Sequence, residues 1–214
     1  MKLYGYWRSS CTWRVRIALH HKGLDFEYVP VHLVNDGGEQ FFEAHTQRNP
    51  LAQVPVLELD TADGRSLILS QSLAIMEYLE ERFADPPILP DEMVERAYVR
   101  QVSEMINAGV QPLQNLATLK AVVQLGADKM QWGRRWIQEG LLALEQLVSA
   151  RPRQPYLCGQ MPTMADFCLI PQLYNARRFS CEMARFPTLL AVESRCEQLE
   201  AFQLAHPSQQ SDAQ

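Results

Sequence analysis

Two hydroxyl groups and a thiol stand side by side near the start of the chain, at Ser9, Ser10 and Cys11. The apolar pattern after them predicts a helix over residues 12–22 that Gly23 ends. A helix N-terminus collects backbone N–H groups and the positive end of the helix dipole, so it favours a bound anion, including a thiolate. These residues therefore predict either an anion or thiolate site, or the ordinary capping of a helix by serine.

Two further positions could contact a small peptide-like ligand. A strand is expected to open at Val54-Pro55, and a cis bond there would turn the preceding backbone N–H and C=O outward, free to pair with an extended ligand. The next helix is expected to open at Gln71-Ser72, where a hydroxyl, a side-chain amide and first-turn N–H groups could hold a carboxylate. Both positions are therefore candidate binding sites.

Residues 1–24 carry five basic side chains and no acidic one. They are Lys2, Arg8, Arg14, Arg16 and Lys22. Because the whole chain has 20 basic and 25 acidic residues and a net charge of −5, nucleic acid is not an expected partner. The local excess is consistent with attraction of a small polyanion, with a solvated face at Arg14 and Arg16, or with pairing of these two to acids elsewhere.

Five cysteines are spread along the chain, and no two of them form a C-x-x-C pair. An odd number at wide spacing predicts neither a disulfide framework nor a zinc site. We expect four of them to be small buried hydrophobic residues: Cys158, Cys168, Cys181 and Cys196. Cys11 differs because of its hydroxyl neighbours.

The 214 residues, of which 47% are hydrophobic, suffice to bury a sizeable core in one large domain or two small ones. Ordinary glycine, proline and charge content excludes a disordered or fibrous chain. The apolar stretches are far shorter than the roughly 20 residues of a membrane helix. Because the N-terminus shows no leader pattern, we expect a soluble, cytoplasmic protein.

The first half of the chain alternates strands and helices. In chain order we expect a strand at 2–7, a helix at 12–22, a strand at 26–33, a helix near 39–46, strands at 55–59 and 66–69, and a helix at 72–83. A turn at Asp63-Gly64 joins the last two strands. This order predicts a small α/β sandwich in which the first two strands pair in parallel and the last two form a hairpin.

The second half, beyond a proline-rich break near residues 85–90, shows helical patterns and no convincing strand. Helices are expected at 91–119 with interruptions near Gly109 and Pro112, at 128–150, at 164–179 and at 187–205. Thr163 and Asp166 have the spacing of a capping box, and Pro171 is expected to kink the helix that they start. The polar tail at 206–214 is expected to fray.

Several of these motifs occur together in a recognisable order. They read S-S-C-x-W-R-V-R-I-A-L from Ser9, N-P-x-x-Q-V-P from Asn49 and Q-S-L-A-I from Gln71, with Asp166 in its capping box. Over nearly the whole chain the sequence resembles the zeta class of the glutathione transferases. The first string is the signature of the maleylacetoacetate isomerases in that class, and the segments at 109–116 and 175–179 resemble the same isomerases.

The resemblance implies the glutathione transferase fold, an α/β plus all-α architecture. A thioredoxin-like domain at 1–84 would bind glutathione, an all-helical domain at 90–214 would bind the substrate, and the protein would be a homodimer. It also implies that Ser9 lies beside the glutathione sulfur, with Ser10 and Cys11 lining the same corner.

The remaining glutathione contacts implied by the resemblance come from two segments. The Val54 backbone would pair with the cysteinyl unit, ahead of a cis proline at Pro55. Gln71 and Ser72 would grip the γ-glutamyl carboxylate.

Three residues of the helical half would contact the substrate by the same resemblance. Gln111 and Asn115 would lie over it, and Arg178 would bind its carboxylate. Some maleylpyruvate-specific relatives carry a histidine and an extra arginine in the segment where this chain has Gln111 and Ala117. This departure favours maleylacetoacetate as the substrate.

The activity implied is the glutathione-dependent conversion of maleylacetoacetate to fumarylacetoacetate in aromatic amino-acid breakdown, with a glutathione transferase side activity. A thiolate that adds to the double bond and later leaves would permit the rotation. The alternatives are a maleylpyruvate isomerase, a thiol transferase that uses Cys11 for a mixed disulfide, and a non-catalytic module on the same fold.

Overall fold

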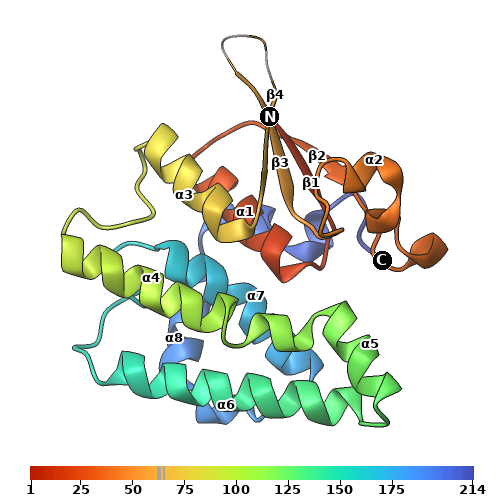
Figure 1. Cartoon of the computed structure of the whole chain (residues 1–214). Helices are drawn as coiled ribbons and strands as arrows, with labels where there is room; N and C mark the ends of the chain where they lie inside the picture. Colours follow the sequence, from red (N-terminus) through yellow and green to blue (C-terminus); the bar gives the residue numbers. More distant parts are fainter. Residues whose placement is uncertain (62–63, 65) are drawn as a thin grey trace. The chain divides into compact units, whose positions relative to one another are not determined.

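The computed structural model describes residues 1–61, 64 and 66–214 (Figure 1). Its contacts divide the chain into two compact units: Met1–Pro87 together with Leu199–Gln214, and Ile88–Gln198. The C-terminal segment thus packs with the first unit, whereas the sequence placed it with the helical domain at 90–214. In the described part of the chain, no helix has the length and apolar character needed to cross a membrane.

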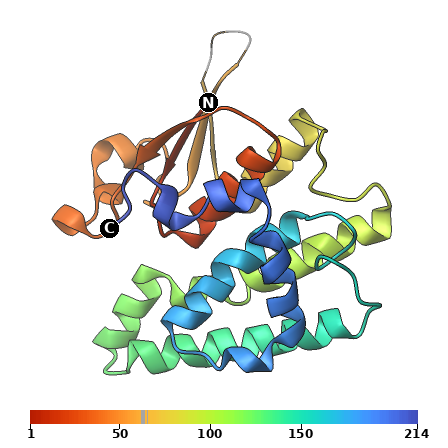
Figure 2. The ribbon, with the colours of Figure 1, turned by 180° about the vertical axis from the view of Figure 1, so that it is seen from behind.

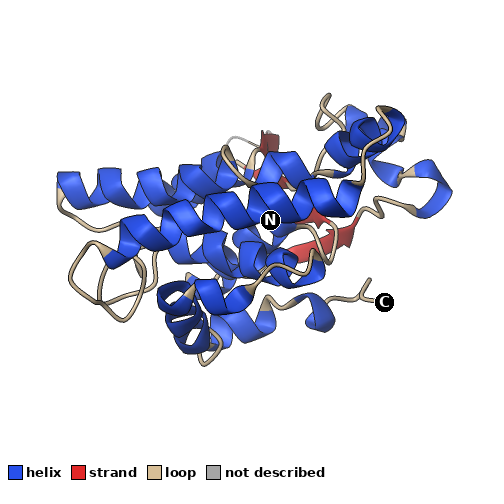
Figure 3. Ribbon diagram, turned by 90° about the horizontal axis from the view of Figure 1, so that it is seen from below, coloured by secondary structure: helices blue, strands red, loops and turns tan. Residues whose placement is uncertain are grey.

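The first unit contains one four-stranded sheet, drawn in red in Figure 3. Its strands are β1 (Lys2–Gly5), β2 (Glu27–Pro30), β3 (Val56–Asp60) and β4 (Ser66–Ser70), in the order β2-β1-β3-β4. The predicted parallel pair, β1 with β2, and the predicted antiparallel hairpin, β3 with β4, are both confirmed. Of the predicted turn, Asp63 lies outside the described residues, and Gly64 has a positive φ of 79° that favours glycine.

The helices of the first unit come from both ends of the chain. They are α1 (Ser10–His21), α2 (Glu43–Thr46), α3 (Ser72–Arg82) and α9 (Glu200–Leu204), with short 3₁₀ turns at Asn35–Gly37, Glu39–Phe41 and Pro207–Gln209. The helix expected near 39–46 is therefore a 3₁₀ turn followed by a single helical turn. Helix α1 is the central one, because both α3 and α9 pack against it (Figures 1 and 2).

The C-terminal tail is held in place, so the prediction that it frays is wrong. Asp212 Oδ2 accepts hydrogen bonds from the Trp7 backbone N–H at 3.0 Å and from the Tyr28 hydroxyl at 3.3 Å. The fully buried Arg16 donates to the carbonyl of Trp7 at 2.7 Å and to that of Ala205 at 3.1 Å. Segments from the two ends of the chain therefore share one polar cluster, which local sequence patterns do not reveal.

The second unit is helical, and its described residues form no strand beyond an isolated bridge between Tyr156 and Gly159. Its helices are α4 (Met93–Asn107), α5 (Leu116–Gln124), α6 (Lys129–Ser149), α7 (Met164–Arg178) and α8 (Pro187–Cys196), with 3₁₀ turns η3 (Gln111–Gln114) and η4 (Met183–Arg185). The expected interruption near Gly109 and Pro112 is confirmed. The helix expected at 187–205 is instead two helices, α8 and α9, and Pro171 lies inside one continuous α7.

The predicted capping box at the start of α7 is confirmed. Asp166 Oδ2 accepts from the Thr163 backbone N–H at 2.7 Å and from its hydroxyl at 3.0 Å, and Oδ1 accepts from the Leu157 N–H at 2.9 Å. The carboxyl is fully buried, and loss of hydration raises its pKa to about 6 despite these donors. This helix N-terminus is closed by the chain itself.

Candidate functional site

The start of α1 has the features of the predicted anion site. Ser9 is the N-cap, with φ −66° and ψ 121°, and its hydroxyl oxygen accepts from the Thr12 backbone N–H at 3.3 Å. No acidic residue lies in the first turn. A Cβ atom on Gly5 would lie only 2.2 Å from Thr12 Cγ2, so glycine allows α1 to begin close against β1. The dipole and N–H groups of this turn therefore meet no negative charge on their own helix.

Cys11 is partly exposed in the first turn of α1, whereas the other four cysteines are buried. All five are free thiols. Burial raises the pKa of the Cys158, Cys181 and Cys196 thiols, which keeps them protonated and unreactive. The expectation that these cysteines are small buried residues is confirmed, and Cys11 stays distinct from them.

The side chain of Arg14 connects the start of α3 with the start of α1. Arg14 Nη1 donates to the Ser72 hydroxyl oxygen at 3.3 Å and lies 3.9 Å from Cys11 Sγ. Ser72 is the buried first residue of α3, and Gln71 before it has a positive φ of 71°. A non-glycine residue in this conformation is costly, and such residues also occur at Asp36, Ala52 and Ser180, outside the predicted site. The structure thus brings the Ser9–Cys11 turn and the Gln71–Ser72 turn together.

The segment before β3 is shaped by hydrogen bonds to a single carbonyl. The Asn49 side-chain amide donates to the Gln53 carbonyl oxygen at 2.9 Å, and His45 Nε2 lies 2.9 Å from the same oxygen. The Val54–Pro55 peptide bond that follows is cis, as the resemblance implies. The N-P-x-x-Q-V-P motif is therefore a folded loop that presents Val54, and His45 is a supporting residue that sequence reasoning missed.

Three of the five basic residues of the first segment, Arg14, Arg16 and Lys22, are buried rather than spread over a solvated face. Arg14 and Arg16 have no exposed surface, so the solvated-face interpretation is wrong for both. Burial lowers the pKa of Arg16 to about 10. Lys22 forms a buried ion pair with Glu80 at 2.8 Å and also donates to two carbonyls of the segment after α3. Of these side chains, Arg14 is the one that contacts predicted site residues.

The predicted substrate residues of the second unit form two local pairs. Gln111 Nε2 donates to Asn115 Oδ1 at 2.5 Å, and Arg178 Nη1 donates to Asn175 Oδ1 at 2.8 Å. A third, buried amide pair, Gln114 to Gln172 at 2.6 Å, ties η3 to α7. The segments that carry Gln111 and Arg178 are therefore held together by a contact that the sequence did not predict.

The two adjacent arginines at the end of α7 have different partners. Arg177 makes a two-pronged ion pair with Glu193 of α8, at 2.6 Å and 2.5 Å, and this pair raises the arginine's pKa. Glu193 is buried, so loss of Arg177 would leave a buried acidic side chain without this partner. Arg178 is exposed and contacts a neutral amide. Arg177 is thus engaged by Glu193, whereas Arg178 is the residue that the resemblance assigns to the substrate carboxylate.

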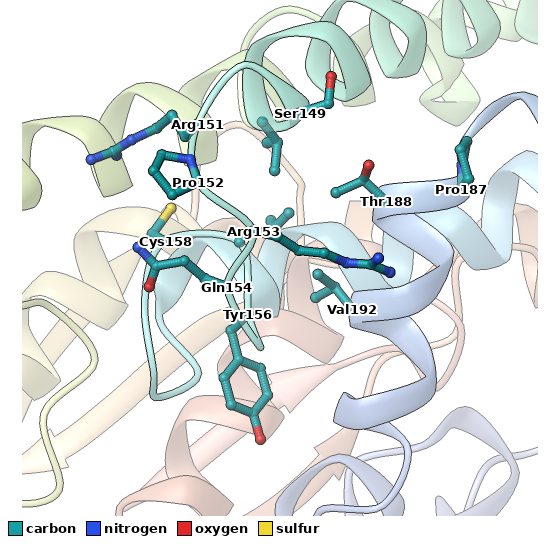
Figure 4. A pocket seen from close by; sticks show the side chains of 12 residues that line it. Ser149, Arg151, Pro152, Arg153, Gln154, Tyr156, Cys158, Pro187, Thr188 and Val192 are labelled. Atoms are coloured by element: carbon teal, nitrogen blue, oxygen red, sulfur yellow. The ribbon is translucent and has the colours of Figure 1, made fainter.

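A separate hollow of about 310 Å³ lies in the second unit between the end of α6, the following loop and the start of α8 (Figure 4). None of the predicted site residues lines it. Arg151 on its rim is paired with Glu95 at 2.6 Å, and the Thr188 and Leu189 N–H groups at the start of α8 are taken by Glu145. The Arg151 guanidinium and these helix-terminal N–H groups therefore already have partners within the chain.

The sequence is similar to known proteins over nearly its whole length. Residues 1–81 match the family model for the N-terminal domain of glutathione S-transferases. A maleylacetoacetate isomerase of Mus musculus is 46% identical over 98% of this chain and 94% of its own length.

Solved structures also match the whole chain, two isomerases among them. One is a maleylacetoacetate isomerase from Anaeromyxobacter dehalogenans with bound GSH, 46% identical, with a TM-score of 0.89 over 100% of this chain and 97% of that one. The other is a holo maleyl pyruvate isomerase, described as a bacterial glutathione S-transferase of the zeta class. It is 36% identical, with a TM-score of 0.93 over 100% of both chains.

Proposed function

Because the chain belongs to the zeta class of the glutathione transferases, we propose that it isomerises maleylacetoacetate to fumarylacetoacetate with glutathione as its cofactor. It has the fold of that family: a thioredoxin-like α/β unit and an all-helical unit. It is a glutathione-dependent isomerase, since its full-length relatives are isomerases and glutathione-bound structures are among them. The identity of the substrate is the part that we propose.

The observation that carries the proposal is the open N-terminus of α1 in the turn of Ser9, Ser10 and Cys11. It offers a hydroxyl, first-turn N–H groups and a helix dipole with no acid in the turn. The start of α3 offers the buried Ser72 hydroxyl as a donor for a carboxylate. These donors fit a ligand that ends in a thiolate at one corner and a carboxylate at another, as glutathione does.

Isomerisation requires temporary loss of the double bond, and bound glutathione supplies a sulfur that adds to the alkene carbon and leaves again. In our proposal the Ser9 hydroxyl donates to that sulfur and, with the dipole of α1, keeps it ionised. The Val54 backbone and the Gln71–Ser72 turn hold the rest of the cofactor.

The residues of the second unit would hold the substrate. Arg178 would bind its carboxylate with paired, charge-assisted hydrogen bonds, while the amides of Gln111 and Asn115 would donate to the carbonyl oxygen on which charge develops. Some maleylpyruvate-specific relatives carry a histidine and an extra arginine in the segment where this chain has Gln111 and Ala117, and this departure supports maleylacetoacetate. Maleylpyruvate is the second candidate, because an isomerase of that substrate is a close structural match.

The test compares Arg178→Met with Arg177→Met, its neighbour in an ion pair. Loss of the carboxylate anchor should cost Arg178→Met about 2–4 kcal/mol, roughly 30-fold to 1000-fold in kcat/KM on maleylacetoacetate. Turnover of an uncharged aryl halide and glutathione binding should be spared. Arg177→Met should instead lower the melting temperature. Equal losses by Arg178→Met on charged and uncharged substrates would place the carboxylate site elsewhere.

Kinetics of the parent protein on both substrates decide between the candidates. A higher kcat/KM on maleylpyruvate than on maleylacetoacetate would replace the proposed substrate with the second one. Cys11→Ala tests the thiol-transferase alternative: retained isomerase activity supports glutathione as the source of sulfur, and a trapped mixed disulfide at Cys11 in the parent would contradict it.

We further propose a cytoplasmic homodimer that acts in the breakdown of tyrosine and other aromatic amino acids. The pathway follows from the chemistry of the proposed substrate, and the assembly from family membership. Sedimentation analysis at several concentrations measures the assembly, and a monomer at all of them would contradict it.

A further inference from the structure

A fully buried cation, Arg14 of α1, lies between the two predicted parts of the glutathione site. Its Nη1 atom is 3.3 Å from Ser72 Oγ at the start of α3 and 3.9 Å from Cys11 Sγ at the start of α1. Ser72 is 58 residues away along the chain, so this contact is a product of the fold. Burial of a guanidinium is unfavourable unless its N–H groups serve acceptors, which makes the choice of those acceptors informative.

The chemistry of the two groups fixes the direction of the hydrogen bond. A guanidinium has donors only, so the Ser72 oxygen must accept from Arg14. The hydroxyl hydrogen of Ser72 is then left to donate to another group, and a permanent positive charge stands directly behind it. A hydroxyl oriented and polarised in this way is a better donor to a carboxylate than a freely rotating one.

We infer that Arg14 is a positioning residue for glutathione: it holds the Ser72 hydroxyl as a donor toward the γ-glutamyl carboxylate. It acts through Ser72 and does not itself touch the cofactor. The contact with Cys11 places the same charge beside the thiol corner, so one cation supports both ends of the site. The inference rests on the proposed function, because it assigns a role toward the cofactor of that reaction.

Arg16 provides a matched comparison on the same helix. It is also fully buried, but it donates to the carbonyls of Trp7 and Ala205, and its guanidinium lies 5.6 Å from the centre of the Tyr28 ring. These contacts serve the packing of the C-terminal segment. Removal of either arginine takes a buried cation from α1, but of the two it is Arg14 that donates to Ser72.

The experiment is a double-mutant cycle on cofactor binding, measured by calorimetry. Glutathione and γ-aminobutyryl-cysteinyl-glycine, which lacks only the γ-glutamyl carboxylate, are titrated into the parent, Arg14→Met, Ser72→Ala and the double variant. Each single change should weaken glutathione binding about tenfold, and the double variant should lose about the same tenfold because the two residues act in one chain. The analogue should bind all four proteins within about twofold.

Two controls separate positioning from folding. Arg16→Met should lower the melting temperature and leave the preference for glutathione over the analogue unchanged. Arg14→Lys keeps a cation without the fork of donors and should lose only about threefold. A loss of about a hundredfold in the double variant, or equal weakening of both ligands by Arg14→Met, would overturn the inference. So would unfolding of both Arg14 variants, which would assign the residue to the fold.

The failures are distinguishable from one another. If the parent binds no glutathione, the proposed function fails. If the parent binds and isomerises but the cycle is additive, only the role of Arg14 fails.

Discussion

The helices α1 and α7 start with the same kind of capping residue, but they differ in whether an acid lies in the first turn. Ser9 caps α1 and Thr163 caps α7, each with a hydroxyl in an extended conformation. The third residue of α7 is Asp166, whose carboxylate takes three donors, whereas the third residue of α1 is Thr12. The start of α7 is closed by an acid of its own first turn, whereas the first turn of α1 contains no acid.

The difference shows how one element serves stability in one place and binding in another. Every helix start has N–H groups that need an acceptor. An acid at the third position supplies one permanently, and its absence leaves the dipole uncompensated until a ligand arrives. A serine cap alone is therefore ambiguous, and the residue three places further on decides between the two uses.

The largest effect on stability is expected from removing the acid that caps α7. Asp166→Ala leaves the N–H groups of Thr163 and Leu157 without their buried acceptor, which should cost about 3 kcal/mol of unfolding free energy. Denaturant unfolding measures it. Asp128→Ala, at the exposed cap of α6, is the matched control and should cost about 1 kcal/mol. Equal losses would mean that burial of the carboxylate adds nothing to the cap.

The same carboxyl group makes the stability contributed by the start of α7 depend on pH. Its pKa is about 6 in the folded protein, above the ordinary value of 3.8, so the folded state holds the proton more tightly than the unfolded state. The contribution of Asp166 is therefore fully present below about pH 4 and falls as the pH rises toward 6, by roughly 2–3 kcal/mol in all. The unfolding free-energy difference between the parent and Asp166→Ala should shrink across this range. A difference that grows with pH would reverse the assigned direction.

An acid introduced at the third position of α1 should give this helix the same kind of N-terminus as α7. Thr12→Asp puts a carboxylate at the third position, where it competes with the ligand for the dipole and repels a thiolate. Glutathione binding should weaken by about 2 kcal/mol, roughly 30-fold. Thr12→Asn has nearly the same shape and no charge, so it should lose much less. If both variants lose the same affinity by calorimetry, packing rather than charge explains the loss.

The smallest effects are expected from removing the hydroxyl of either N-cap residue, Ser9 or Thr163. Ser9→Ala should raise the pKa of the bound glutathione thiol by about one unit, equivalent to about 1.4 kcal/mol, because the thiolate loses a donor. Thr163→Ala should cost about 1 kcal/mol of stability and leave that pKa unchanged. Thiolate absorbance followed against pH measures the first effect, and an unchanged titration in Ser9→Ala would transfer the role to Ser10 or Cys11.

The contacts that the sequence predicted and the contacts that it missed differ in how far apart the two residues lie along the chain. The Thr163–Asp166 box and the start of α1 involve residues three apart, so helical spacing alone predicts them. The Arg14–Ser72 contact spans 58 positions and the Trp7–Asp212 contact spans 205, and no periodicity relates such pairs. Two missed features, the burial of Arg14 and Arg16 and the ordered tail, depend on which distant segments meet. The division of the expected helix at 187–205 into α8 and α9 is a local feature that the helical pattern also missed.

The return of the last segment to the first unit has a consequence for how the protein is made. Leu199–Gln214 follows Ile88–Gln198 in the chain, so all of Met1–Pro87 is synthesised before it. The acceptor that Ala205 gives to Arg16, and the one that Asp212 gives to Trp7, do not yet exist for the nascent chain. The first unit therefore completes its packing only after Ile88–Gln198 has been synthesised, and an early stop codon that removes Leu199–Gln214 damages a part of the molecule that was made much earlier.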